Sequence, residues 1–142
     1  MPPKLLYQRQ VSELKTECPP KSAETKNTPC YRLSMENHEH NENFLPRAIT
    51  GLGLGNRPVQ CDDFGLSFYD NLDGIRKLRK NLSKRIKNII WKKILQGTLE
   101  VSDGLQTVPN SKGHFDLHVY EEVLGSLPKR FEVIIDYSDD KD

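Results

Sequence analysis

A row of apolar residues recurs every three or four positions after residue 71. That spacing is typical of one buried face of an α-helix. Asp70 or Asn71 can cap the start of such a helix, and Gly97 can end it. The pattern therefore predicts a long amphipathic helix over 72–96. Its apolar row consists of Leu72, Ile75, Leu78, Leu82, Ile86, Ile89, Ile90 and Ile94.

Within this predicted helix, the segment 76–93 reads RKLRKNLSKRIKNIIWKK, with basic residues at half of its positions and no acidic residue. On a helical wheel most of the cations lie opposite the apolar row, and the indole of Trp91 projects among them. An aromatic ring among cations is typical of surfaces that stack on nucleic-acid bases. The predicted partner-binding residues are Arg76, Lys77, Lys80, Lys84, Lys87 and Trp91.

Two interpretations of this basic surface stay open. The formal net charge of the chain is only +1, so attraction to a polyanion must come from local placement of charge. In the first interpretation the surface binds nucleic acid or an acidic protein, although no zinc-finger, RRM or KH motif selects nucleic acid. In the second it is a solvated helix face that acidic residues elsewhere in the protein neutralise.

The remaining segments predict the fold class. Strand-like segments lie at 30–34, 64–71, 114–120 and 130–137, and the Asp103-Gly104 pair predicts a hairpin between two short strands. Strands before and after one long helix favour an α+β fold, with the helix packed on a mostly antiparallel sheet. We expect this to be a single domain over 30–142.

Residues 1–29 predict a disordered leader, because prolines interrupt a polar segment that buries little apolar surface. The three cysteines, Cys18, Cys30 and Cys61, are widely spaced and form no C-x-x-C pair, so they predict free thiols rather than a zinc ribbon. No apolar run has the length of a signal peptide or a membrane span. A reducing cytoplasm is the expected location, and no membrane partner is expected.

Histidines and glycines provide weaker candidates for a site. His38 and His40 lie in an acidic tract that favours a surface loop over a metal site. His114 and His118 would share a face of a strand about 13 Å apart, too far to hold one ion, so no metal site is predicted. The glycines of the GLGLG segment match neither phosphate-loop motif. The surrounding loop, 43–63, is a candidate ligand or partner loop.

The order of segments resembles ADP-ribosyltransferase-like domains over about 90 residues. Arg32 in CYRLS matches an arginine on a first strand, and Ser67 or Tyr69 in GLSFYDN matches a residue on a second strand before a helix. Glu121 or Glu122 matches a glutamate after a later strand, although the Ser-Thr-Ser and Glu-x-Glu motifs are missing. The resemblance implies an enzyme that uses NAD, with Arg32, Ser67 and Glu121 as catalytic residues.

Overall fold

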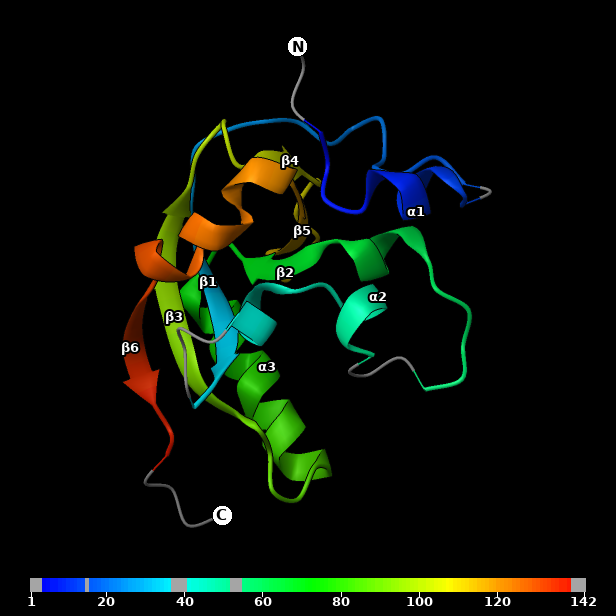
Figure 1. The fold of residues 1–142 in the computed structure, drawn as a ribbon. Coiled ribbons are helices and arrows are strands. Elements are labelled where there is room, and N and C mark those ends of the chain that lie inside the picture. The colour runs from blue at the N-terminus through cyan, green and yellow to red at the C-terminus, as the bar shows by residue number, and fades with distance from the viewer. Residues whose placement is uncertain (1–3, 15, 37–40, 52–54, 139–142) are drawn as a thin grey trace.

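The computed structural model describes residues 4–14, 16–36, 41–51 and 55–138. A six-stranded sheet has the order β4-β5-β2-β1-β3-β6, and each neighbouring pair is antiparallel (Figure 1). The α+β class predicted from the sequence is therefore confirmed. The strands are β1 (Thr28–Met35), β2 (Leu66–Tyr69), β3 (Trp91–Leu99), β4 (Gly104–Gln106), β5 (His114–Val119) and β6 (Glu132–Asp136).

Helix α3 (Leu72–Arg85) packs on one face of the sheet. The Asn71 side chain caps it by accepting a hydrogen bond from the Gly74 amide at 2.7 Å. Ile75 of α3 is buried with Tyr69 of β2 and Ile94 of β3, so these three residues form the core of this layer.

The predicted helix over 72–96 is wrong in its second half. The backbone of Ile86 is extended, and Asn88 has a positive φ of 54°, a left-handed conformation that asparagine adopts more readily than most residues. Residues 91–99 then pair with β1 and β6 as β3. Ile94 and Trp91 favour a strand, and two neighbouring strands satisfy the backbone groups of this segment.

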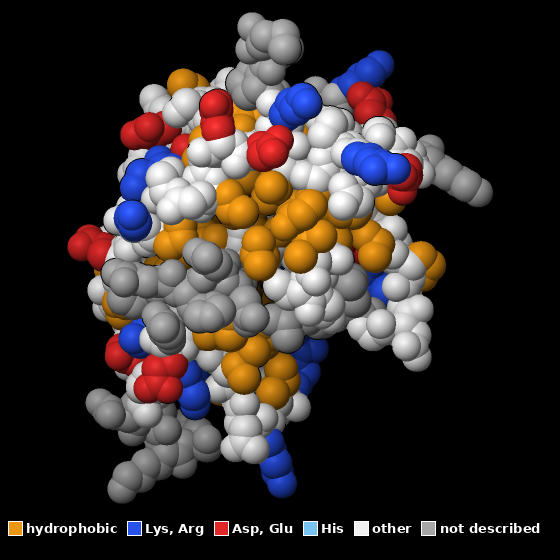
Figure 2. All heavy atoms as spheres, viewed as in Figure 1, with side chains coloured by type: hydrophobic (Ala, Val, Ile, Leu, Met, Phe, Trp, Pro, Cys, Tyr) orange, Lys and Arg blue, Asp and Glu red, His pale blue; other side chains and the backbone are white. Residues whose placement is uncertain are grey.

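The opposite face of the sheet carries the larger core. This core contains Phe68 of β2 with Phe115 and Leu117 of β5. It also contains Phe44 and Phe131, which lie outside the strands. Short 3-10 segments cover this face, namely η1 (Asn41–Phe44), η3 (Glu121–Ser126) and η4 (Pro128–Arg130). Figure 2 shows one side of the molecule, on which hydrophobic side chains gather in the middle and many charged side chains lie toward the edges.

The predicted Asp103-Gly104 hairpin is also wrong. The expected hairpin would pair β3 with β4, but β4 pairs with β5, and β3 lies four positions away from β4 in the sheet. Asp103 is instead almost fully buried, and its carboxylate accepts hydrogen bonds from both Nη groups of Arg130, at 3.1 and 2.6 Å. This ion pair fixes the β3–β4 connection against η4.

The N-terminal segment packs on the domain, which differs from the predicted disordered leader. Helix α1 (Gln8–Ser12) buries Val11, and Leu5 forms a bridge with Tyr120 at the end of β5. Glu24 exchanges backbone hydrogen bonds with Gln106 of β4. A few apolar side chains and added strand pairing therefore offset the ordering entropy of this segment.

A disulfide joins Cys18 to Cys61 at the start of η2 (Cys61–Phe64). The predicted free thiols are therefore wrong for these two residues, while Cys30 is a free and buried cysteine. Widely spaced cysteines gave no local signal for this pair because the fold brings together segments 43 residues apart. Disulfides are typical of oxidising compartments, so this pair argues against the expected cytoplasmic location. Among the described residues, no helix combines the length and apolar character that crossing a bilayer requires.

Candidate functional site

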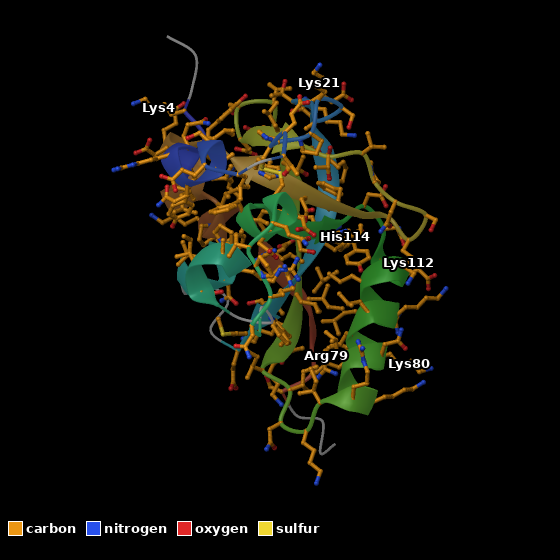
Figure 3. All side chains as sticks on the ribbon, turned by 90° about the vertical axis from the view of Figure 1, so that its right-hand side faces the viewer. Lys4, Lys21, Arg79, Lys80, Lys112 and His114 are labelled. Atoms are coloured by element: carbon orange, nitrogen blue, oxygen red, sulfur yellow. A yellow bond between two sulfur atoms is a disulfide. The ribbon has the colours of Figure 1, made fainter. Side chains whose placement is uncertain are left out.

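Most of the predicted basic surface is present on α3. Arg76, Lys77, Lys80 and Lys84 are all exposed on this helix, and exposed Lys87 follows in the turn after it. Lys77 forms an ion pair with Asp73 one turn earlier, at 3.1 Å, and such an exposed pair contributes little. Figure 3 shows Lys80 pointing away from the sheet, whereas Arg79 lies on the inner side of α3.

Trp91 does not join these lysines, because the helix ends before it. It begins β3, is half-buried, and lines a small pocket of about 240 Å³ with Arg32, Ile75 and Leu82. The predicted base-stacking role therefore has no support from its position.

A second concave surface lies where α3 turns into β3, and we call it the basic cleft. Its volume is about 540 Å³, and none of the described residues that line it is acidic. Five cations from the helix, the turn and β3 surround it. The lining residues are Arg79, Ser83, Lys84, Arg85, Ile86, Lys87, Asn88, Ile89, Lys92 and Tyr137.

Arg79 is fixed in the wall of the basic cleft. Its Nε donates to the Trp91 carbonyl oxygen at 2.8 Å, and its guanidinium lies over the Tyr137 ring at 4.3 Å. Tyr137 is held in turn by a hydrogen bond from its amide to the Lys92 carbonyl at 2.7 Å. Among the described residues no carboxylate pairs with Arg79, so its charge adds to the positive potential of the cleft.

Two of the three residues suggested by the ADP-ribosyltransferase resemblance lie together. The Nη1 of Arg32 donates to the Ser67 carbonyl at 2.6 Å, and both side chains line the pocket that contains Trp91. Arg32 also donates to the Asn43 carbonyl and lies over the Phe44 and Phe68 rings. Burial lowers the pKa of Arg32 to about 10. These contacts join β1, β2 and η1, which is a structural role.

Glu121 is not among the residues that line this pocket. It begins η3 beyond the end of β5, is exposed, and its amide donates to the Lys4 carbonyl at 2.8 Å. The neighbouring Glu122 is exposed in the same segment. The suggested catalytic residues therefore do not converge on one pocket, and a nicotinamide nucleotide has no shared site among them.

A row of titratable side chains follows one face of β5. The Ser67 hydroxyl lies 2.6 Å from the Nε2 of His114, and the same nitrogen lies 3.6 Å from an Asp116 carboxylate oxygen. A catalytic Ser-His-Asp triad needs the serine and the aspartate at opposite ring nitrogens. This arrangement is therefore not a triad, although the residue types match one.

Burial shifts the protonation of this row. Burial raises the pKa of Asp116 to about 7, with Asp62 adding to the rise. Burial lowers the pKa of His114, and lowers that of His118 to about 4. Both imidazoles are therefore neutral near pH 7.

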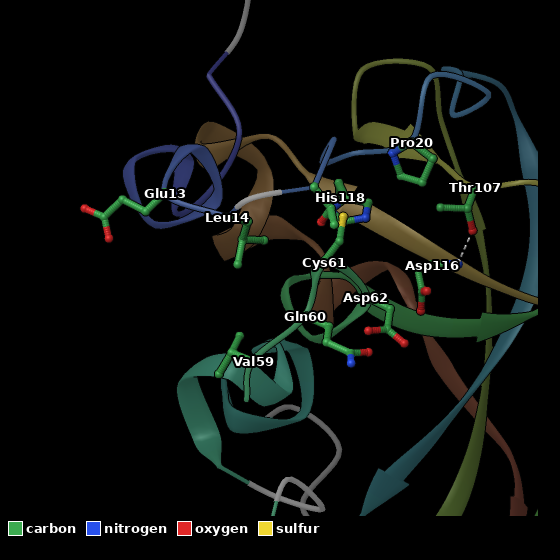
Figure 4. A pocket seen from close by; sticks show the side chains of 11 residues that line it. Glu13, Leu14, Pro20, Val59, Gln60, Cys61, Asp62, Thr107, Asp116 and His118 are labelled. Atoms are coloured by element: carbon green, nitrogen blue, oxygen red, sulfur yellow. Dashed lines mark hydrogen bonds between the residues drawn. The ribbon is translucent and has the colours of Figure 1, made fainter. Parts of the chain in front are cut away.

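A pocket of about 620 Å³ lies beside the end of this row (Figure 4). Asp116, His118, Asp62 and Cys61 line it together with apolar residues of the N-terminal segment. The ligand atoms of Cys18, Cys61 and His118 all lie within 4.8 Å of one another. Sequence reasoning missed this cluster, because its members come from three distant segments and no local spacing marks them.

The loop predicted as a ligand loop over 43–63 is partly described. Helix α2 (Arg47–Thr50) contributes Arg47 and the later loop contributes Arg57, and both pair with the buried carboxylate of Asp63. Arg57 holds the pKa of Asp63 below its usual range. Arg47 and Arg57, which flank the GLGLG segment, therefore form ion pairs with Asp63 within the protein. The middle of GLGLG, like the His38–His40 tract, lies outside the described residues.

No protein-family model matches this chain, and comparisons with curated proteins and with solved structures also give no match. The function must therefore be argued from the geometry of the chain itself.

Proposed function

We propose that this protein binds the phosphate backbone of single-stranded nucleic acid along α3 and in the basic cleft. The observation that supports the proposal is a concave surface with five lining cations and no acidic residue among its described members. Cations that surround a concavity raise the local concentration of an anionic ligand more than the same charges on a flat surface.

The exposed cations of α3 extend this surface beyond the cleft. Arg76, Lys80 and Lys84 follow each other at four-residue steps, which places them roughly 6 Å apart along the helix axis. A row of this kind leads into the cleft through Lys84. An extended, flexible polyanion can follow such a row, whereas a single phosphate would engage only part of it.

Binding of this kind depends on charge and carries little sequence preference. Trp91 lies in a different pocket, and the Tyr137 ring is occupied by Arg79, so neither aromatic ring is offered to a base. Phosphate contacts give affinity without reading sequence.

The first test is a salt titration of the affinity for a labelled single-stranded oligonucleotide, followed by fluorescence anisotropy. Four or five phosphate contacts predict that log K falls with log salt concentration with a slope of about −3. A flat response would contradict the proposal.

The decisive comparison uses two double variants that change the net charge equally. Lys84→Glu with Lys87→Glu reverses two cations of the cleft, and we expect a loss of affinity of about tenfold or more and a slope smaller by about 1.4. Lys4→Glu with Lys21→Glu is the control, because both lysines lie at the opposite end of the molecule (Figure 3). Equal losses in both variants would mean that only overall charge matters.

A polyglutamate peptide forms the third arm of the test. If this peptide binds the basic cleft more tightly than the oligonucleotide at the same salt concentration, the partner is an acidic protein and the nucleic-acid proposal is wrong.

A further inference from the structure

His118 is a largely buried histidine at the edge of a pocket. Its side chain lies on β5 and is only 3% exposed. The described part of the chain gives its imidazole no hydrogen bond and no ion pair. His118 lines the pocket of about 620 Å³, so its imidazole is available to a ligand that enters there.

The nearest chemistry to this imidazole is a pair of sulfur atoms. One nitrogen of His118 and the Sγ atoms of Cys18 and Cys61 lie within 4.8 Å of one another. Figure 4 shows His118 beside Cys61 at the edge of the pocket. Both cysteines are partly exposed, so a small reductant can reach their disulfide.

We propose that Cys18, Cys61 and His118 form a zinc site when the disulfide is reduced. Two thiolates and one imidazole are ligands that Zn²⁺ prefers. In a tetrahedral zinc site these ligand atoms lie roughly 3.5–3.8 Å apart, so the two sulfur atoms, which are bonded to each other in the disulfide, must first separate. Once the S–S bond is broken, rotation of the two cysteine side chains moves the sulfur atoms apart while the imidazole stays within reach of both.

The fourth ligand is a water molecule from the adjoining pocket. Among the described residues, no carboxylate oxygen lies close enough to all three ligand atoms to join the group. Cys61 and His118 line the pocket of about 620 Å³, which provides both the water and a path of entry for the ion.

The disulfide becomes a zinc site in two steps. A dithiol reductant gives two electrons and two protons to the disulfide, which becomes two thiols while the reductant becomes a disulfide. Zn²⁺ then replaces the two thiol protons, which pass to solvent. The N-terminal segment and η2 stay joined in both states, by the disulfide in an oxidising compartment and by the ion in a reducing one, and the ion also joins them to β5.

The proposal is independent of nucleic-acid binding, because the cluster shares no residue with the basic cleft. The test reduces the full chain with a phosphine under anaerobic conditions and titrates it with Co²⁺, whose thiolate charge-transfer absorption reports the ligands. One Co²⁺ for each chain, displaced by Zn²⁺, is expected for the reduced protein, and none is expected for the oxidised protein.

Three variants assign the ligands. His118→Gln is expected to weaken Co²⁺ binding by about tenfold or more. His114→Gln is the matched control, because it removes an imidazole from the same face of β5. Cys30→Ala removes the third thiol of the chain and is also expected to leave binding unchanged.

Several results would overturn the proposal. They are no charge-transfer band in the reduced protein, equal affinity in His118→Gln and the unchanged chain, or loss of binding in His114→Gln. Circular dichroism of the reduced chain adds a fourth outcome, since a chain that unfolds on reduction and does not refold with Zn²⁺ also excludes the site.

Discussion

At the scale of single residues, burial separates the three cysteines into two chemical classes. Cys30 lies on β1 inside the larger core and is completely buried. Burial raises the pKa of its thiol to about 12, so almost no thiolate exists near neutral pH. Cys18 and Cys61 are partly exposed and can exchange with other thiols once reduced.

We therefore expect Cys30 of the native, oxidised protein to resist alkylation by iodoacetamide at pH 8. The reagent reacts with thiolate, which is scarce at four pH units below the raised pKa of Cys30. Mass spectrometry of the intact chain measures the labelling, and the same protein in denaturant provides the fully labelled reference. Complete native labelling within the time needed in denaturant would contradict this prediction.

At the scale of elements, the start of α3 follows a local signal and its end does not. Of the two candidate caps, Asp70 and Asn71, the structure has Asn71 as the N-cap. The end at Arg85 depends on β1 and β6, which take the following residues into the sheet. Tertiary pairing therefore overrides a helical periodicity that continues in the sequence.

The substitution Asn71→Ala is expected to lower the free energy of unfolding by about 1 kcal/mol. It removes the oxygen that accepts the Gly74 amide, and also the Asn71 amide that donates to Asp70. Urea denaturation followed by circular dichroism measures the change. Asn81→Ala on the exposed side of α3 is the control and should change stability by less than about 0.5 kcal/mol.

At the scale of the whole molecule, a few long-range contacts hold together segments that the sheet alone does not fix. The Cys18–Cys61 disulfide attaches the N-terminal segment to η2. The Arg130–Asp103 ion pair attaches η4 to the connection after β3, where Asp103 also accepts the Glu100 amide at 2.6 Å. These contacts let short 3-10 segments and loops cover the core.

The substitution Arg130→Ala is expected to destabilise the protein by about 3 kcal/mol, because it leaves the carboxylate of Asp103 buried without its cation. Lys129→Ala, at the exposed neighbouring position, is the matched control and should have little effect. Thermal unfolding of both variants makes the comparison. Similar melting temperatures for the two would show that the ion pair contributes no stability.

Local patterns in the sequence were enough to predict the α+β class, the start of the amphipathic helix, most of the strands and the concentration of cations after residue 75. Each of these depends on periodicity or composition within a short window. The end of α3, the position of Trp91 and the meeting of Arg79 with Tyr137 in the basic cleft depend instead on contacts between distant segments. The same is true of the meeting of Cys18, Cys61 and His118, because strand pairing brings together residues whose separation along the chain leaves no local pattern.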